Sequence, residues 1–469
     1  MARRPWPRAE RSFKDVDDMN DLNQDLLAAL LDSEDDELIA EGIPALAAPG
    51  VALPLSFSQQ QLWFLQQYEP GLTAYNLPRV FRLRGALDVG ALQQAFQALI
   101  DRHAVLRTRY ESRDGVAVQC VLASAPFVLG HEDCRHLPAR EGQARAAEAV
   151  DRTVSHVFDL GTAPPLVARV VTVSADEHVL AVCLHHIASD AWSNPLIARD
   201  LAEAYRLALS AGDGPPQWPA LPVQYADYAA WQRARADEGG FQRELAYWNA
   251  HLGAEVPTLN LPTDLPRGTQ RRFEGAAALF EVDAQLSADL VGLGRALQCT
   301  PFMLMLAAWQ ALLSRQAGQG DFAIGVAHAG RHRPEARALV GFFINTQVFR
   351  ARVAPGMSWR ALCRQVRENT LAAMDHADLP FEVLLDSRTE RRDPARSPLF
   401  QVMFGLQVDD GQTTLALEGL QADALDAPAT GAKFELSLDI TLTGGLLQGR
   451  LEYATALFTP TTAQRLVEG

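Results

Sequence analysis

Two adjacent histidines and an aspartate are the residues of this sequence that are best suited to chemistry. Residues 185–190 read HHIASD, so Asp190 follows His186 by four positions. The apolar run before them, residues 178–184, predicts a buried strand whose carboxyl end presents these side chains. Neutral imidazole exchanges a proton near pH 7, and a nearby carboxylate can orient it or brace its loop.

Spacing alone leaves three interpretations of this hexapeptide open: metal ligands, core residues or an acid–base unit. Adjacent strand residues point to opposite faces, so His185 and His186 are poorly placed to hold one ion, and we expect no metal. The sequence has no GxSxG nucleophile motif, and Cys183 suits a small buried hydrophobe. A catalytic unit would therefore assist direct transfer rather than form a covalent enzyme intermediate.

The composition limits the classes of partner. The chain has 469 residues and a net charge of -15, which argues against nucleic acid because phosphate binding needs clustered Lys and Arg. No stretch approaches 18 uninterrupted apolar residues, so we expect no membrane span, and the N-terminus lacks the apolar core of a secretory signal. Five scattered cysteines without CxxC spacing favour a reducing cytoplasm.

The first fifty residues differ from the rest of the chain. Residues 15–41 contain eleven acids and no base. Their leucines fall on one helical face, namely Leu22, Leu26, Leu27, Leu30 and Leu31. This pattern allows a solvated acidic leader or a short docking helix, and we treat residues 1–50 as an N-terminal extension.

The body of the chain mixes helical and strand patterns, which predicts an α+β fold. A loop rich in Gly and Pro at residues 212–222 separates an expected N-terminal lobe, residues 51–220, from a C-terminal lobe, residues 221–469. Amphipathic patterns predict helices over 58–67, 89–102, 241–252 and 301–315. Apolar runs predict strands over 80–83, 166–173, 179–184, 322–326, 400–408, 434–442 and 449–453.

Six further blocks accompany HHxxxD in a fixed order. They are SFSQQQLWFL (56–65), RHAVLRT (102–108), YADYAAWQ (225–232), IG…GR…GFFINT (324–346), DLPFE (378–382) and SPLFQVMF (397–404). Together with residues 185–190, this set resembles the condensation domains of nonribosomal peptide synthetases. The resemblance is to a free-standing, LCL-like member, and it covers residues 54 to about 404.

The resemblance implies two lobes like chloramphenicol acetyltransferase, arranged as a V around a central tunnel. It implies an acyltransferase that moves an acyl or peptidyl group from a carrier protein to an amine or hydroxyl acceptor, forming an amide or an ester. The thioester would arrive on the phosphopantetheine arm of the carrier protein, so the enzyme itself would bind no cofactor. A family member of this kind would serve antibiotic or other secondary metabolism.

The resemblance also implies roles for single residues. His186 would act as general base or position the nucleophile, while His185 would support the loop. Asp190 would pair with Arg102 or Arg107. The residues expected to line the tunnel or contact substrate are Ser189, Ala191, Trp192 and Asn345, and Arg331 is expected near the tunnel mouth or in solvent.

Two departures from the family pattern bear on function. Ala191 stands where the family has Gly, which costs about 1 kcal/mol if that position needs a positive φ and otherwise narrows the space beside His186. The sequence also lacks adenylation motifs and a carrier segment. We therefore expect a monomer that recruits its carrier protein in trans and takes a soluble or carrier-bound acceptor, with possible chain release.

Alternative functions remain for the same fold. One is a catalytically inactive recruitment platform, although such domains usually lose part of HHxxxD. Another is epimerisation, for which the expected EGHGR-like segment is missing. A third is acetyl transfer from free coenzyme A.

Overall fold

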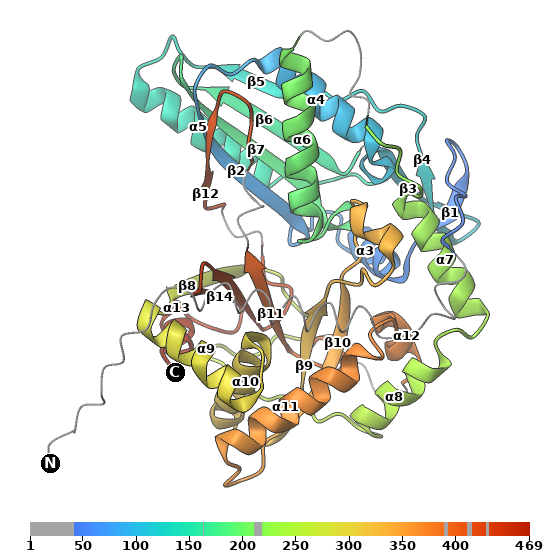
Figure 1. Ribbon diagram of the computed structural model, residues 1–469, viewed down its shortest axis with the longest axis vertical. Coiled ribbons are helices and arrows are strands. Elements are labelled where there is room, and N and C mark those ends of the chain that lie inside the picture. Colours follow the sequence, from blue (N-terminus) through green and yellow to red (C-terminus); the bar gives the residue numbers. More distant parts are fainter. Residues whose placement is uncertain (1–41, 163, 211–217, 389–392, 410–414, 428–430) are drawn as a thin grey trace, which may run out of the picture.

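Two mixed β-sheets with flanking helices make up the computed structural model (Figure 1). The structure describes residues 42–469 except 163, 211–217, 389–392, 410–414 and 428–430. The mixed α+β class predicted from the sequence is confirmed. The leucine-rich segment of the N-terminal extension lies outside the described residues, as does most of the Gly- and Pro-rich loop.

The first sheet carries the HHxxxD hexapeptide and lies in the upper half of Figure 1. Its five strands run in the order β12 (Gln421–Leu425), β2 (Asn76–Arg84), β7 (Glu177–His185), β6 (Leu166–Thr172) and β5 (Gly130–Asp133). All neighbours are antiparallel except β5 and β6. Helix α5 (Ala139–Val154) contacts β6, β7 and β2, whereas α4 (Val89–Arg102) and α6 (Ser193–Leu209) pack on each other.

The second sheet lies in the lower half of Figure 1. Its six strands run in the order β10 (Asn345–Arg352), β9 (Asp321–His328), β11 (Val402–Asp409), β13 (Leu436–Thr443), β14 (Leu446–Ala454) and β8 (Gly275–Glu281). Strand β11 is parallel to both of its neighbours. The helices of this half are α8 (Gln242–Leu252), α9 (Ala284–Leu297), α10 (Pro301–Ala317), α11 (Trp359–Met374), α12 (Phe381–Asp386) and α13 (Pro460–Glu468).

Smaller elements complete the described fold. A three-stranded sheet runs in the order β1 (Ala52–Pro54), β4 (Val116–Val121) and β3 (Thr108–Arg113). Two helices, α3 (Phe57–Tyr68) and α7 (Tyr225–Asp237), lie near it. Short 3₁₀ turns are η2 (Ala104–Arg107), η3 (His186–Ala188) and η4 (Pro334–Ala338).

Local sequence explains why the helices begin where they do. Asp88 caps α4 by accepting a hydrogen bond from the Ala91 amide, and Thr300 caps α10 in front of Pro301. On β13, Leu436, Leu438, Ile440 and Leu442 are buried in the core of the second half, as strand alternation requires. Each predicted helix and strand is present, with boundaries that differ by a few residues.

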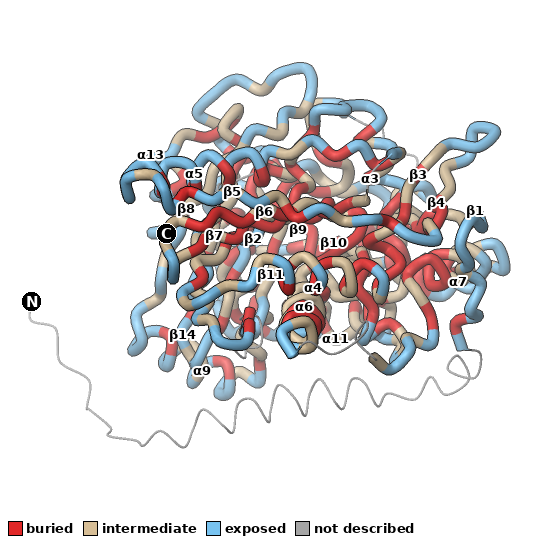
Figure 2. Tube along the Cα trace, turned by 90° about the horizontal axis from the view of Figure 1, so that it is seen from above, coloured by how far each residue is buried: buried red, intermediate tan, exposed pale blue. Residues whose placement is uncertain are grey.

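The two halves share structure across the expected lobe boundary. Strand β12, which follows residue 420, adds to the edge of the first sheet by pairing with β2. The core of the first half also takes in Tyr225 and Tyr228 of α7, together with Leu339 and Phe343. Buried segments therefore run through both halves (Figure 2).

Among the described helices, none is both long and apolar enough to cross a membrane by itself. The sharply bent pair α9 and α10 meets the length and hydropathy criteria only when the two helices are taken together.

Candidate active site

Strand β7 brings the two histidines to the end of the first sheet. It lies between β2 and β6, and its last six residues are buried. The His185 amide donates to the Pro165 carbonyl at 3.0 Å, and the His186 amide donates to the Tyr75 carbonyl at 2.9 Å. The chain then turns into η3, so His186 is the first side chain beyond the strand.

The ring of His186 is held in one tautomer. Its Nδ1 lies 2.8 Å from the Ser189 carbonyl oxygen, which can only accept, so Nδ1 carries the proton. Among the described residues, Nε2 has no hydrogen-bond partner and keeps its lone pair. The ring packs on Phe342 with centroids 4.6 Å apart. His186 is half-buried, so this arrangement presents a proton acceptor within a partly enclosed site.

Both histidines are held in the uncharged form. Burial, followed by the charge of Lys433, lowers the pKa of His186 well below its ordinary value. The same two causes lower the pKa of the buried His185 to about 3. His185 Nδ1 accepts a hydrogen bond from the Ile187 amide at 3.1 Å, so its ring braces the turn that follows the strand.

Asp190 lies in a fully buried network. Its Oδ1 accepts hydrogen bonds from the Ser193 amide at 2.9 Å and the Ser193 hydroxyl at 2.7 Å, and Oδ2 accepts from the Phe343 amide at 2.9 Å. Arg331 Nη2 forms an ion pair with Oδ1 at 3.1 Å. The same guanidinium donates to the carbonyls of Ala336 and Leu339 and lies 4.1 Å from the Phe343 ring centroid.

The predicted pairing of Asp190 with Arg102 or Arg107 is wrong. Arg102 binds Asp200 at 2.9 Å together with His103, and Arg107 donates to the carbonyls of Ile100, Asp101 and Leu122. These arginines brace α4 and the turn that follows it. The expectation that Arg331 lies near the tunnel mouth or in solvent is also wrong. Arg331 is buried and forms an ion pair with Asp190.

The residues between Asp190 and α6 show why alanine is tolerated after the motif. Ala191 is not among the non-glycine residues with positive φ, so its backbone does not require glycine. Ser189 is buried and fixes His186 through its carbonyl. Trp192 is 45% exposed, and its indole N–H donates to the Arg337 carbonyl at 3.4 Å.

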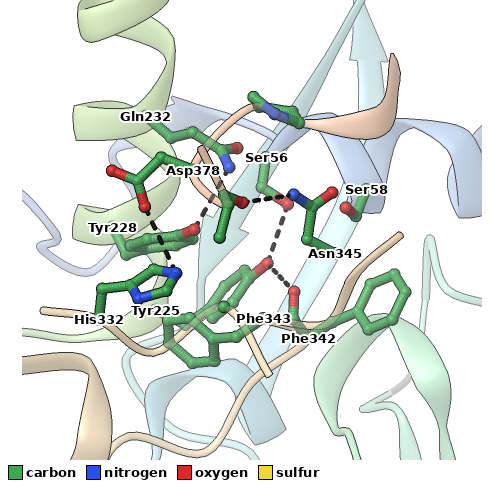
Figure 3. A pocket seen from close by; sticks show the side chains of 13 residues that line it. Ser56, Ser58, Tyr225, Tyr228, Gln232, His332, Phe342, Phe343, Asn345 and Asp378 are labelled. Atoms are coloured by element: carbon green, nitrogen blue, oxygen red, sulfur yellow. Dashed lines mark hydrogen bonds and ion pairs between the residues drawn. The ribbon is translucent and has the colours of Figure 1, made fainter. Parts of the chain in front are cut away.

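Asn345 lines a small polar pocket beside this network (Figure 3). Its amide donates to the carbonyls of Ala377 and Leu379, and its oxygen accepts from the amides of Thr346 and Phe381. The pocket lining includes Ser56, Tyr225, Tyr228, His332, Phe342 and Asp378. Since Phe342 also packs on His186, the pocket adjoins the candidate catalytic histidine.

Several site residues were not predicted from the sequence. Tyr75 anchors the His186 amide, Phe342 packs on its ring, and Gln59 donates to the Ile187 carbonyl of the catalytic turn at 3.2 Å. Phe342 and Gln59 lie in motif blocks, but neither residue was assigned a role at the site from the sequence. Tyr75 directly precedes β2, and its contact is made by its backbone, which no side-chain pattern reveals.

Two helix-flanked mixed sheets, with a histidine at a strand end beside loops of the other half, define a chloramphenicol acetyltransferase-like protein. The chain belongs to the condensation-domain family, because the family model described as "Condensation domain" matches residues 51–469. Such domains of nonribosomal peptide synthetases are acyltransferase-type enzymes that generally form amide bonds between substrates held on carrier proteins.

Similar sequences occur in large synthetases. A linear gramicidin synthase protein of Brevibacillus parabrevis is 40% identical over 88% of this chain, which spans 5% of that protein. Phosphinothricin tripeptide synthetase PhsC of Streptomyces viridochromogenes is 38% identical over 89% of this chain. This chain spans 38% of the length of PhsC. The chain therefore spans only a small part of several relatives.

Solved structures agree with this assignment. The X-domain from teicoplanin biosynthesis has a TM-score of 0.82 and 26% identity, with coverage of 91% of this chain and 95% of the X-domain. SgcC5 from Streptomyces globisporus has a TM-score of 0.71 and 26% identity, with coverage of 88% and 96%. The epimerization domain TycB3(E) shares the fold, with 22% identity and a TM-score of 0.74. The match covers 91% of this chain and 96% of the epimerization domain.

Proposed function

We propose that this protein transfers an acyl or peptidyl group from a carrier-bound phosphopantetheine thioester to an amine or hydroxyl acceptor. The observation that carries the proposal is the arrangement of His186, whose Nδ1 is committed to the Ser189 carbonyl while Nε2 keeps its lone pair. Burial favours the uncharged ring, which is the form that accepts a proton.

The transfer follows from this geometry. The acceptor nitrogen or oxygen attacks the thioester carbonyl carbon, and its proton passes to Nε2 of His186. The C–S bond then breaks, and the proton moves to the leaving thiolate, so the products are an amide or ester and a free thiol. Proton handling of this kind contributes typically 10²- to 10⁴-fold in rate.

Asp190 supports this chemistry at a distance. Through Ser193 and the Phe343 amide it ties the loop after His186 to the segment that carries Phe342. The ring of Phe342 contacts His186. The role of Asp190 is therefore to position two walls of the site, and Arg331 compensates its buried charge.

The phosphopantetheine arm would come from the carrier protein, so the enzyme would need no cofactor of its own. The polar pocket that adjoins Phe342 offers hydroxyl, amide and imidazole groups to the amides of such an arm. A tunnel between two lobes would let donor and acceptor reach His186 from different sides. We expect one monomer and a separately supplied carrier protein to suffice for transfer.

The acceptor of the acyl group could carry a hydroxyl instead of an amine, so both kinds of acceptor are to be tested. SgcC5 has been solved with a vicinal diol, (R)-(-)-1-(2-naphthyl)-1,2-ethanediol, and it shares this fold at 26% identity. A small soluble acceptor of that kind would release the chain from its carrier as an ester. An amine on a second carrier would instead extend the chain as an amide.

The alternative function is a platform that recruits other proteins and has no catalytic activity. The similarity to one solved structure favours it. The teicoplanin X-domain, which has been solved in complex with OxyB, shares 27% identity and a TM-score of 0.80 with this chain. Against it stands the complete hydrogen-bond set around His186 and Asp190. A platform would bind a loaded carrier protein or a tailoring enzyme and leave the thioester intact.

Intact-mass spectrometry of a loaded carrier protein tests the proposal. The protein is incubated with acyl-carrier thioester and either an amine or a diol acceptor, and loss of the acyl mass from the carrier is followed alongside product formation. Product with at least one acceptor supports acyl transfer. Carrier binding without product supports the platform, inversion of a donor stereocentre without transfer supports epimerisation, and equal product from an acyl-coenzyme A without carrier contradicts the need for a carrier protein.

A further inference from the structure

Two basic side chains that the mechanism above does not use lie near the start of strands in the second sheet. Lys433 precedes β13, and Arg271 precedes β8. Both side chains are half-buried. In the described part of the chain, neither of them forms an ion pair. A cation that is partly removed from water is costly unless an anion compensates it, so these two charges lack an expected partner.

Contacts connect this basic pair to the catalytic strand of the first half. Lys433 Nζ lies 5.4 Å from the ring centroid of Tyr75, which directly precedes β2. The Tyr75 carbonyl accepts a hydrogen bond from the His186 amide at 2.9 Å. Arg271 joins the same group, because its Nη2 donates a hydrogen bond to the Lys433 carbonyl. The basic pair is thus linked to the residue that anchors the catalytic histidine.

Several hydrogen-bond donors of this group have no acceptor. Within the residues that the structure describes, Lys433 Nζ, the Tyr75 hydroxyl, and Nε and Nη1 of Arg271 make no hydrogen bond. None of these atoms is sealed from solvent, in contrast to unpaired buried atoms such as Arg331 Nε. Burial raises the pKa of Tyr75, so its hydroxyl keeps its proton and remains a donor. Tyr75, Arg271 and Lys433 therefore form a donor cluster that a ligand can reach.

The neighbouring carboxylates do not neutralise the donor cluster by direct pairing. Glu435 is held by Arg267 through two bonds of 2.6 and 2.9 Å. Glu452 Oε1 accepts from the backbone amide of Lys433 at 3.4 Å, rather than from its ammonium group. Glu452 and Asp439 act on Lys433 through their charge, but burial raises the pKa of both acids and so disfavours that charge. An external anion can therefore still bind the two cations.

A carboxylate has the chemistry that suits the donor cluster. A guanidinium group presents paired N–H donors to the two oxygens of a carboxylate, and an ammonium group adds a compact charge. Phosphate is another common anion, but the phosphate of a phosphopantetheine arm lies at the opposite end of the arm from the thioester. Because the cluster is linked to His186 through Tyr75, it lies toward the reacting end, where the groups of the substrates are found.

We propose that Tyr75, Arg271 and Lys433 form a subsite for a carboxylate that one of the two substrates carries. This group is the α-carboxylate of a free amino-acid acceptor or a carboxylate on the acyl chain of the donor. Once bound, it holds its substrate near His186 and compensates cations that the fold leaves unpaired. The three residues set substrate choice and take no part in proton transfer. This inference rests on the proposed acyl transfer and names a substrate class for it.

Substrates that differ by one charge test the subsite in the transfer assay. The acceptor pair is an α-amino acid and its carboxamide, and the donor pair is a carrier-bound acyl group with a terminal carboxylate and its methyl ester. Arg271→Met and Lys433→Met should raise KM about 10- to 100-fold for the charged member of one pair, because a charge-assisted hydrogen bond is lost. We expect kcat to stay near the wild-type value, and KM for the uncharged member to stay unchanged. The pair that responds identifies the source of the carboxylate.

Two control variants separate ligand binding from folding. Arg272→Met removes the adjacent, exposed arginine and should leave KM unchanged for both members of each pair. Lys433→Arg keeps the positive charge and should restore most of the preference for the charged member. A purely structural role would impair charged and uncharged substrates alike. Equal effects on both members of both pairs, or no effect on any substrate, would overturn the proposal.

A binding measurement tests the subsite without turnover. Reductive ¹³C-methylation of the full chain labels its two lysines, Lys14 and Lys433, and keeps their charge, while Lys433→Arg assigns the Lys433 signal. Acetate should shift this signal saturably, acetamide should not, and Arg271→Met should weaken the binding of acetate. If the wild type shows this shift but transfers no acyl group, the proposed function fails and the subsite stands. No saturable shift with acetate, or a shift with inorganic phosphate alone, would overturn the carboxylate subsite.

Discussion

At the scale of single residues, the buried carboxylate of Asp190 depends on the guanidinium of Arg331, a partner that is remote in the sequence. The strand leading to His186 is local, and an apolar run followed by HHxxxD suffices to place it. The arginine that pairs with Asp190 lies 141 positions further along the chain. Arg102 and Arg107 stand in a motif block too, so only the packing of the two halves could select Arg331.

Removal of Asp190 is expected to destabilise the protein strongly. Asp190→Ala leaves Arg331 buried without its counter-ion and leaves the Phe343 amide without its acceptor. Breaking a buried pair costs about 3–5 kcal/mol. Urea unfolding measures this loss, with Arg84→Ala as the control. The exposed pair of Arg84 with Asp423 should be worth less than about 1 kcal/mol, and equal losses in both variants would contradict the assigned burial.

At the scale of elements, periodic segments were predictable and tertiary contacts were not. The amphipathic pattern of residues 89–102 gives α4, and the apolar run before His185 gives β7. The short strand β12 carries no comparable pattern, since QADAL is mixed in polarity and takes strand form by pairing with β2. Asn345 was predicted at the site, whereas three of its four hydrogen bonds depend on α12 and the loop before it, through Ala377, Leu379 and Phe381.

Helix α12 predicts a pH dependence of stability. Burial raises the pKa of Glu382 to about 7, and Oε2 of this side chain has no hydrogen-bond partner. The protonated form is favoured in the fold, so its stabilisation is fully present below the ordinary glutamate pKa and is lost as pH rises through about 7. Glu382→Gln should therefore unfold at higher urea than wild type at pH 8 and show little advantage at pH 4. A constant difference at both values would argue against a buried, titrating Glu382.

At the scale of the whole molecule, β7, which carries the histidines, lies in the middle of the first sheet. Strand β12, which comes from the second half of the chain, lies at an edge of that sheet. Strand β7 has neighbours on both sides, whereas β12 and β5 form the edges of the first sheet. Local opening costs least where few contacts must break. The site is thus built on the most protected part of the first half, and its second wall comes from loops of the other half.

Hydrogen exchange followed by mass spectrometry should show this gradient. We expect the amides of β7 to exchange more slowly than those of β12 and β5, with β2 and β6 close to β7. Slower exchange in β12 than in β7 would show that the connection between the halves, rather than the catalytic strand, is the stable centre.

If His186 accepts the proton during acyl transfer, its loss should slow single-turnover transfer from a loaded carrier protein. His186→Ala should lower the rate of transfer by about 10²- to 10⁴-fold, because the proton acceptor is lost. The control His136→Ala alters an exposed histidine beyond β5 and should match the wild type. Transfer by His186→Ala at the wild-type rate, in a folded protein, would show that His186 is not the proton acceptor.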